Sequence, residues 1–163
     1  MSRLDSMIRR LEAQRAMLDL ARDALVDVPG VVFELGLGNG RTYDHLRENM
    51  AERDIFVFER KIAAHPTCIP DDTHLYFGEL LETLAPAVAR HRDEVALVHA
   101  DIGGPVPEHC ARMTALLEAE IGPAMAPGAI LLSDLDVTIP GCEPMQLADG
   151  VAAGRYFAVR KAI

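Results

Sequence analysis

The sequence predicts an α/β fold, with a doubly wound, mostly parallel sheet covered by helices on both faces. Short apolar segments rich in β-branched and aromatic residues alternate with longer segments of helical periodicity. The fourth apolar segment is an unbroken run, as in strands covered on both faces. The predicted strands are residues 31–33, 55–58, 74–77, 94–99 and 129–132. Right-handed crossovers give the order 3-2-1-4-5, and residues 155–159 are expected to add one C-terminal edge strand.

Length and composition indicate one domain. A chain of 163 residues with 50% hydrophobic content can bury one substantial core without disulfides or metal ions. We therefore predict a single domain over residues 1–163. Within it, residues 1–29 contain an N-terminal helix and residues 30–163 form the α/β core.

The helices are predicted at residues 2–26, 42–52, 78–90 and 107–125. In the first helix, Ser2 is placed as an N-cap ahead of Asp5. Its apolar residues at helical spacing are Leu4, Ile8, Leu11, Leu18, Ala21 and Leu25. Residues 137–150 hold two prolines and two glycines and are expected to form a loop.

Charge and cysteine content restrict the partners and the compartment. The formal net charge of −9 argues against nucleic acid or an anionic membrane as a partner, because either would be repelled at long range. Three cysteines with no C-x-x-C pair suggest neither a disulfide framework nor a zinc site. With no signal-peptide core and no apolar run of about 20 residues, a cytoplasmic protein is expected.

The segment 31–42, VVFELGLGNGRT, contains the main functional signal. An apolar strand runs into Gly36, Gly38 and Gly40, where residues without a Cβ allow a tight turn and close approach of a ligand to the backbone. The E-x-G-x-G-x-G pattern resembles the first motif of class I S-adenosylmethionine-dependent methyltransferases. It differs from the dinucleotide fingerprint, which requires Gly or Ala at Arg41.

Glu59 is the second informative residue. It ends the second predicted strand and lies 19 positions after Gly40, near the spacing of about 20 residues at which a carboxylate binds ribose hydroxyls. The resemblance further implies a Rossmann-like fold, S-adenosyl-L-methionine as cofactor, and adenine contacts near Gly78 and Glu79. The cofactor-binding residues predicted on these grounds are Glu34, Gly36, Leu37, Gly38, Asn39, Gly40, Arg41, Thr42, Glu59, Arg60, Gly78, Glu79 and Asp101.

His99 and Asp101 are the candidate catalytic residues. Both follow the fourth strand, and in open α/β sheets ligands bind beyond the carboxyl ends of the strands. We therefore expect both to project into the crevice that holds Gly38 and Glu59. A hydroxyl acceptor needs a base or a cation that lowers its pKa, and Asp101 is the preferred candidate.

The stretch GAILLSDLDVTIPG after the fifth strand resembles catechol-type O-methyltransferases, in which acids and an amide hold a divalent cation. That resemblance implies Asp101 and Asp134 as candidate ligands, with Asp136 as a third if the loop is shifted by one residue. Leu135 stands at the position of the family's amide, and Gly104 stands at that of its catalytic lysine. We therefore do not predict a metal site.

These observations together predict methyl transfer from S-adenosylmethionine to a small-molecule acceptor, preferentially oxygen. Two alternatives stay open: a domain that binds S-adenosylmethionine or its demethylated product without turnover, and a nicotinamide-dependent oxidoreductase. The amphipathic N-terminal helix and a sheet that ends with the chain also predict a homodimer or larger homo-oligomer.

Overall fold

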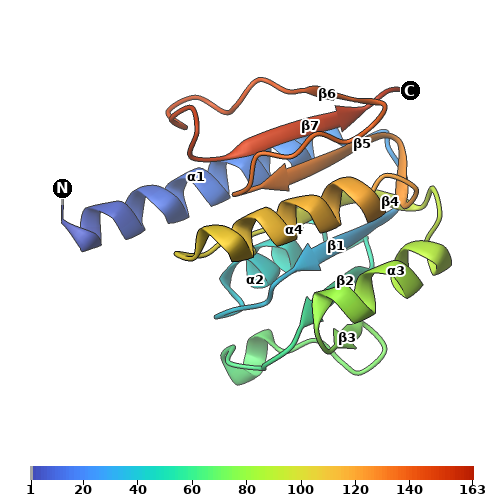
Figure 1. Cartoon of the computed structure of the whole chain (residues 1–163), viewed down its shortest axis with the longest axis horizontal. Coiled ribbons are helices and arrows are strands. Elements are labelled where there is room, and N and C mark those ends of the chain that lie inside the picture. The colour runs from blue at the N-terminus through green and yellow to red at the C-terminus, as the bar shows by residue number, and fades with distance from the viewer. Residues whose placement is uncertain (1) are drawn as a thin grey trace.

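Residues 2–163 are described by a computed structural model, and they build one seven-stranded sheet with helices on both faces (Figure 1). The helices are α1 (Arg3–Ala24), α2 (Arg41–Asn49), α3 (Leu80–Arg90) and α4 (Pro107–Glu120), with a short 3-10 helix at Pro66–Cys68. The strands are β1 (Val31–Leu35), β2 (Ile55–Glu59), β3 (Leu75–Phe77), β4 (Val95–Ala100), β5 (Met125–Ser133), β6 (Cys142–Pro144) and β7 (Phe157–Lys161).

The sheet order is β3-β2-β1-β4-β5-β7-β6, which confirms the predicted order 3-2-1-4-5 and the fold class. The first five strands of the chain pair in parallel, whereas β7 pairs antiparallel with both β5 and β6. Because the order reverses next to β1, the carboxyl ends of β1, β2 and β4 meet at one edge of the sheet, where a ligand can bind.

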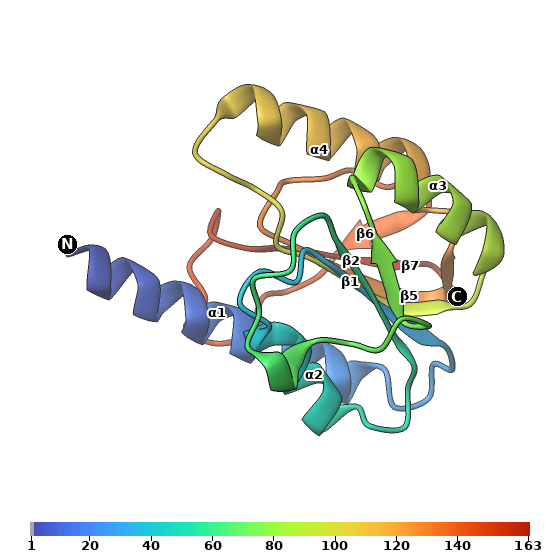
Figure 2. The ribbon, with the colours of Figure 1, turned by 90° about the horizontal axis from the view of Figure 1, so that it is seen from below.

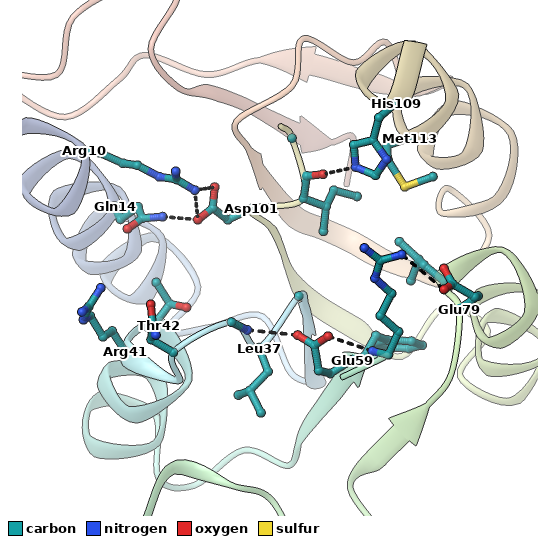
Figure 3. A pocket seen from close by; sticks show the side chains of 18 of the residues that line it. Arg10, Gln14, Leu37, Arg41, Thr42, Glu59, Glu79, Asp101, His109 and Met113 are labelled. Atoms are coloured by element: carbon teal, nitrogen blue, oxygen red, sulfur yellow. Dashed lines mark hydrogen bonds and ion pairs between the residues drawn. The ribbon is translucent and has the colours of Figure 1, made fainter. Parts of the chain in front are cut away.

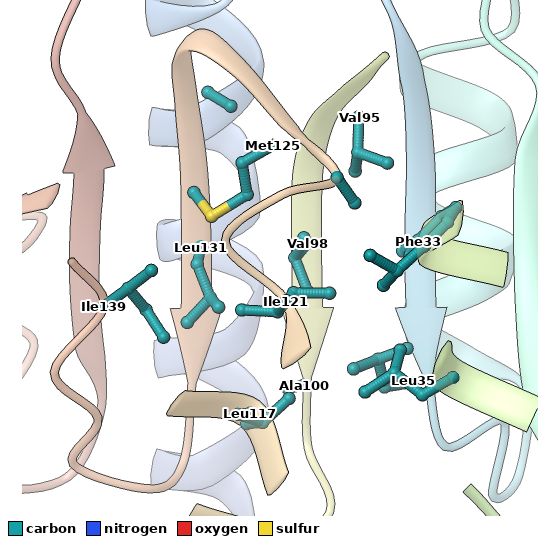
Figure 4. Close-up of a cluster of buried hydrophobic side chains, with 14 of the residues drawn as sticks. Phe33, Leu35, Val95, Val98, Ala100, Leu117, Ile121, Met125, Leu131 and Ile139 are labelled. Atoms are coloured by element: carbon teal, nitrogen blue, oxygen red, sulfur yellow. The ribbon is translucent and has the colours of Figure 1, made fainter. Parts of the chain in front are cut away.

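The sheet separates two apolar layers. In Figure 2, α3 and α4 lie on one side of the sheet and α1 and α2 on the other. Alternate residues of β1 supply each layer: Phe33 and Leu35 pack toward α3 and α4, and Val32 packs toward α1 and α2. Figure 4 shows the first layer, in which Leu117 and Ile121 close over β4 and β5. Buried apolar side chains therefore cover both faces of the sheet.

The N-terminal helix begins as predicted but is only partly covered. Ser2 and Asp5 form a capping box, in which each side chain accepts a hydrogen bond from the backbone amide of the other residue. Leu18 packs in the core, whereas Leu4 is 68% exposed and Ile8 is 45% exposed. The first turns of α1 project beyond the sheet (Figures 1 and 2).

Three local expectations are corrected. Helix α4 ends at Glu120 rather than near residue 125, because Gly122 and Pro123 form a turn and Met125 already pairs with β4. Residues 137–150 were expected to form a loop, yet they include β6. Strand β6 is the edge strand of the sheet. Strand β7, which was expected at the edge, lies one position inward. All three differences concern short segments whose strand pairing forms only in the tertiary structure.

Two further findings concern the whole described chain. No helix within residues 2–163 is long and apolar enough to cross a membrane. Cys68, Cys110 and Cys142 are all free thiols.

Candidate functional site

A cavity of about 430 Å³ opens at the carboxyl ends of β1, β2 and β4 (Figure 3). Most of the predicted cofactor-binding residues line it: Gly36, Leu37, Gly38, Asn39, Arg41, Thr42, Glu59, Arg60, Gly78, Glu79 and Asp101. We call it the first cavity. Its size suits a small-molecule ligand, for which binding sites are typically about 300 to 1,000 Å³.

The glycine loop forms the floor of the first cavity because its backbone adopts conformations that favour glycine. Gly36, Gly38 and Gly40 have φ angles of 90°, 51° and 81°. A Cβ on Gly38 would meet nothing within 4 Å, whereas a Cβ on Gly40 would lie 2.6 Å from the Cβ of Cys68. Gly38 therefore leaves open space for a ligand, and Gly40 is required for packing of the loop against the chain behind it.

Glu59 is held in place by three backbone amides. One carboxylate oxygen accepts a hydrogen bond from the Gly38 amide at 3.0 Å, and the other accepts from the Arg60 and Lys61 amides at 2.8 and 2.9 Å. The contact with Gly38 ties the tip of β2 to the glycine loop (Figure 3). The carboxylate thus has a fixed orientation beside the open face of the loop.

Asp101 lies at the opposite side of the first cavity and is bound by α1. Arg10 Nη2 donates to both carboxylate oxygens at 2.6 Å, and Gln14 Nε2 donates to one of them at 2.5 Å. The hydrogen bond with Asp101 raises the pKa of Arg10. Asp101 is therefore an ion-paired carboxylate whose orientation depends on α1 (Figure 3).

Asp134, at the end of β5, is the second acid of this region. Its carboxylate accepts hydrogen bonds from the backbone amides of Ile102 and Gly103 at 3.1 to 3.2 Å. A Cβ on Gly103 would lie 2.4 Å from the carboxylate, so glycine permits this approach. Burial, followed by the nearby charge of Asp101, raises the pKa of Asp134 to about 6.

A second cavity, of about 470 Å³, adjoins the first. Arg10 and Asp101 line both cavities, so this ion pair lies where the two cavities meet. The rest of the second cavity is lined by Ala13, Asp134, Ala152, Ala153, Gly154, Arg155 and Tyr156.

His99 and Glu34 do not lie in the cavities, which corrects two predicted positions. Both side chains are fully buried: His99 Nδ1 lies 2.6 Å from Glu34 Oε2, and His99 Nε2 lies 2.5 Å from the Tyr156 hydroxyl. Thr42 donates its hydroxyl proton to the other Glu34 oxygen. The prediction failed because His99 belongs to β4 itself and points into the layer below α1, whereas Asp101 follows the strand.

The pKa values of two residues in this buried chain of hydrogen bonds are raised. Burial opposes the charge on His99, but the charge and hydrogen bond of Glu34 outweigh it and raise the pKa of His99. Burial also raises the pKa of Tyr156 well above its usual value. When His99 is charged, both of its ring nitrogens donate, and the Tyr156 hydroxyl then accepts from Nε2.

The residues from α1 and α4 were missed from the sequence. Arg10 and Gln14 lie four positions apart on α1, and Gln14, which is 4% exposed, interrupts the predicted apolar face of that helix. That interruption was a usable signal. His109 and Met113 of α4 also line the first cavity, and nothing local to that helix distinguishes them from surface and core residues.

The three candidate metal ligands, Asp101, Asp134 and Asp136, do not form one cluster. Among residues 2–163, no cluster of three or more His, Cys, Asp or Glu side chains has the geometry to hold a metal ion. Asp101 is paired with the Arg10 guanidinium, Asp134 accepts from backbone amides, and Asp136 is exposed.

Gly40, which was predicted to bind the cofactor, does not line the first cavity, because it packs against Cys68.

The sheet order, the glycine loop and the carboxylate at the tip of β2 define the class: a Rossmann-like class I methyltransferase. Residues 1–161 match the family model described as S-adenosyl-L-methionine methyltransferase, and the chain belongs to this family. It is therefore an enzyme that uses S-adenosyl-L-methionine as cofactor. This finding also decides against the two alternatives, a binding domain without turnover and a nicotinamide-dependent oxidoreductase.

Solved structures support the assignment. The chain is 40% identical to an S-adenosyl-L-methionine methyl transferase from Silicibacter pomeroyi DSS-3, with a TM-score of 0.92 and 99% of each chain covered. It shares its fold with a release factor-specific protein-(glutamine-N5) methyltransferase from Alicyclobacillus acidocaldarius (15% identity, TM-score 0.52, 95% and 93% covered). The antibiotic-resistance methyltransferase Kmr is similar to the same degree (11% identity, TM-score 0.53, 91% and 93% covered). No curated protein matches the sequence.

Proposed function

We propose that the first cavity binds S-adenosyl-L-methionine and that the enzyme transfers its methyl group to the oxygen of a small molecule. One observation carries the cofactor assignment. Glu59, oriented by three amides, and the open side of Gly38 face the same cavity at the sheet edge. Glu59 would accept hydrogen bonds from the ribose hydroxyls, while the start of α2 supplies unpaired backbone amides.

The position of Asp101 supports a role in the transfer itself. The sheet order places Glu59 at β2, the glycine loop at β1 and Asp101 at β4, in that spatial sequence. With the adenosyl group bound at Glu59 and the glycine loop, the reactive end of the cofactor would lie near Asp101. S-adenosyl-L-methionine brings the methyl group on a sulfonium that drives the reaction, so the protein must align the reactants and take up the hydroxyl proton. Asp101 is our candidate for that base.

The arrangement does not fit a divalent cation. The Arg10 guanidinium donates to both oxygens of Asp101, so the place beside this carboxylate that a metal ion would take already holds a positive charge. We therefore propose proton transfer to a carboxylate without a metal ion at this position.

We also propose that residues 1–163 act as one cytoplasmic domain and as a homodimer or larger assembly, with no nucleic acid or membrane as a partner. The unit cannot be shortened from its start, because α1 brings Arg10 and Gln14 into the site. Three free thiols suit a reducing compartment. Leu4, Met7 and Ile8 leave apolar surface uncovered on α1.

Calorimetric titration with S-adenosyl-L-methionine and with NADH tests the cofactor site directly. We expect saturable binding of S-adenosyl-L-methionine and none of NADH. A Glu59→Ala variant should lose affinity, whereas Glu82→Ala, an exposed acid on α3, is the matched control. Binding that is unaffected by Glu59→Ala would place the cofactor elsewhere, and production of S-adenosylhomocysteine on adding a hydroxyl acceptor would test the chemistry.

A further inference from the structure

The second cavity continues the first along the sheet edge. After Asp101 at β4, the sheet order brings Asp134 at the end of β5 and Tyr156 directly before β7. Arg10 and Asp101 are common to both cavities. If the cofactor occupies the first cavity as proposed above, a molecule in the second cavity meets its reactive end at Asp101.

The charged side chains that line the second cavity are two arginines and two aspartates, and all but one of them have a hydrogen-bond partner. Arg10 and Asp101 neutralise each other, and the Asp134 carboxylate is satisfied by two backbone amides. Arg155 is different, because no hydrogen bond or ion pair involves its guanidinium in the part of the chain that the structure describes. It is partly exposed and lines the cavity beside Tyr156.

The groups that line the second cavity with Arg155 include a tyrosine and three small residues. Tyr156, whose hydroxyl lies 2.5 Å from His99 Nε2, lines the same cavity. Ala152, Ala153 and Gly154, which have small or no side chains, line the cavity beside Arg155. An arginine with its five donors suits a carboxylate, which it can bind through two parallel hydrogen bonds.

We propose that the second cavity binds the methyl acceptor and that this acceptor is a small hydroxy-carboxylate, with its carboxylate on Arg155 and its hydroxyl beside Asp101. This inference rests on the proposed function. In the reaction, the acceptor oxygen forms a bond to the methyl carbon as the sulfur–carbon bond breaks. The sulfur keeps that electron pair and becomes a neutral thioether, and the hydroxyl proton passes to the Asp101 carboxylate.

The test measures binding to the full chain saturated with S-adenosylhomocysteine, by ligand-observed NMR titration. The probes are two matched pairs that differ in one group: 4-hydroxybenzoate with 4-hydroxybenzamide, and lactate with lactamide. Tyramine is the cationic probe. We expect at least one carboxylate to bind about tenfold more tightly than its amide, the lower end for a hydrogen bond to a charged group.

Arg155→Gln should abolish this preference without changing the affinity for S-adenosylhomocysteine. Arg92→Gln, which removes an exposed arginine away from both cavities, should leave the preference intact. The proposal is overturned if neither carboxylate binds, if the amides or tyramine bind as well as the carboxylates, or if Arg155→Gln keeps the preference. Failure of the wild type to bind S-adenosylhomocysteine would instead overturn the proposed function.

Discussion

Arg10 of the N-terminal helix donates to both carboxylate oxygens of Asp101 at 2.6 Å, across 91 positions of sequence. The pair joins α1 to the carboxyl end of β4 and lies where the two cavities meet. Because the Asp101 side chain is only 16% exposed, water screens this pair less than it screens a surface pair. The N-terminal helix, which precedes the α/β core, thus orients the candidate catalytic carboxylate.

Asp101→Asn should slow methyl transfer without weakening the cofactor site. The amide keeps the shape of the side chain but cannot take up a proton, so we expect loss of about 10²-fold or more in kcat once an acceptor is in hand. The dissociation constant for S-adenosyl-L-methionine should change little. Added Mg²⁺ should shift the Tm of wild type and variant equally, since Arg10 occupies the place of a cation. Undiminished turnover would remove Asp101 from the chemistry.

Glu59→Ala should weaken binding of S-adenosyl-L-methionine by about 1 to 3 kcal/mol, because the ribose hydroxyls lose a charged acceptor. The amides of Gly38, Arg60 and Lys61 lose their partner too, so circular dichroism and Tm must show that the loop keeps its fold. Glu82→Ala is the control. A native variant with unchanged affinity would contradict the ribose assignment.

Asp134→Asn should stabilise the protein at pH 8. The pKa of Asp134 is raised to about 6 in the folded state, so its contribution to stability is full below pH 3.8 and is lost as pH rises through 6. The asparagine avoids this loss while still accepting from the Ile102 and Gly103 amides. After allowance for solvent screening, we expect the variant to gain about 1 to 2 kcal/mol of unfolding free energy at pH 8.

Denaturant titrations of the wild type and Asp134→Asn at pH 4 and pH 8 measure this effect. Asp136→Asn makes the same chemical change at an exposed neighbouring position and should have little effect at either pH. An equal gain in unfolding free energy at both pH values would show that the charge of Asp134 does not destabilise the protein.

His99→Gln should cost about 3 kcal/mol of unfolding free energy, because it leaves the buried Glu34 carboxylate without its charged partner. Since the pKa of His99 is raised, its stabilising contribution is full below pH 6.5 and is lost as pH climbs through the raised value. The cost should therefore be larger at pH 6 than at pH 9. Nitrogen NMR of labelled histidines should show both ring nitrogens of His99 protonated at pH 7.

A surface histidine provides the comparison for that variant. His65→Gln changes an exposed ring and should have little effect on stability. If the NMR spectrum shows a neutral His99 at pH 7, the Tyr156 hydroxyl would instead donate to the ring, and the charged pair with Glu34 would be refuted.

The protein should be a dimer or larger in solution, because Leu4, Met7 and Ile8 are 68%, 47% and 45% exposed on one helix. Light scattering at tens of micromolar protein measures the mass. A Leu4→Glu and Ile8→Glu double variant should give monomers. Val26→Glu changes an exposed apolar residue just after the end of α1 and should leave the oligomer intact. A monomeric wild type would refute the prediction.

Sequence alone determined the alternation of strands and helices, the strand order and the glycine loop. The elements and the loop are local properties: periodicity reports which face of a segment is buried, and glycine permits the positive φ angles at Gly36, Gly38 and Gly40. The strand order follows from the right-handed crossover rule. The family resemblance rested on the same residues. Glu59 could be located because its offset from the loop is set by one strand–helix–strand unit.

Tertiary structure alone decided which polar groups meet. His99 and Asp101 are two positions apart, yet one is buried with Glu34 and the other lines both cavities, because the strand ends between them. The contacts of Arg10 with Asp101 and of Tyr156 with His99 join segments 91 and 57 positions apart. No local pattern encodes such pairs, since they form only when the helices pack on the sheet and bring distant polar groups within hydrogen-bonding distance.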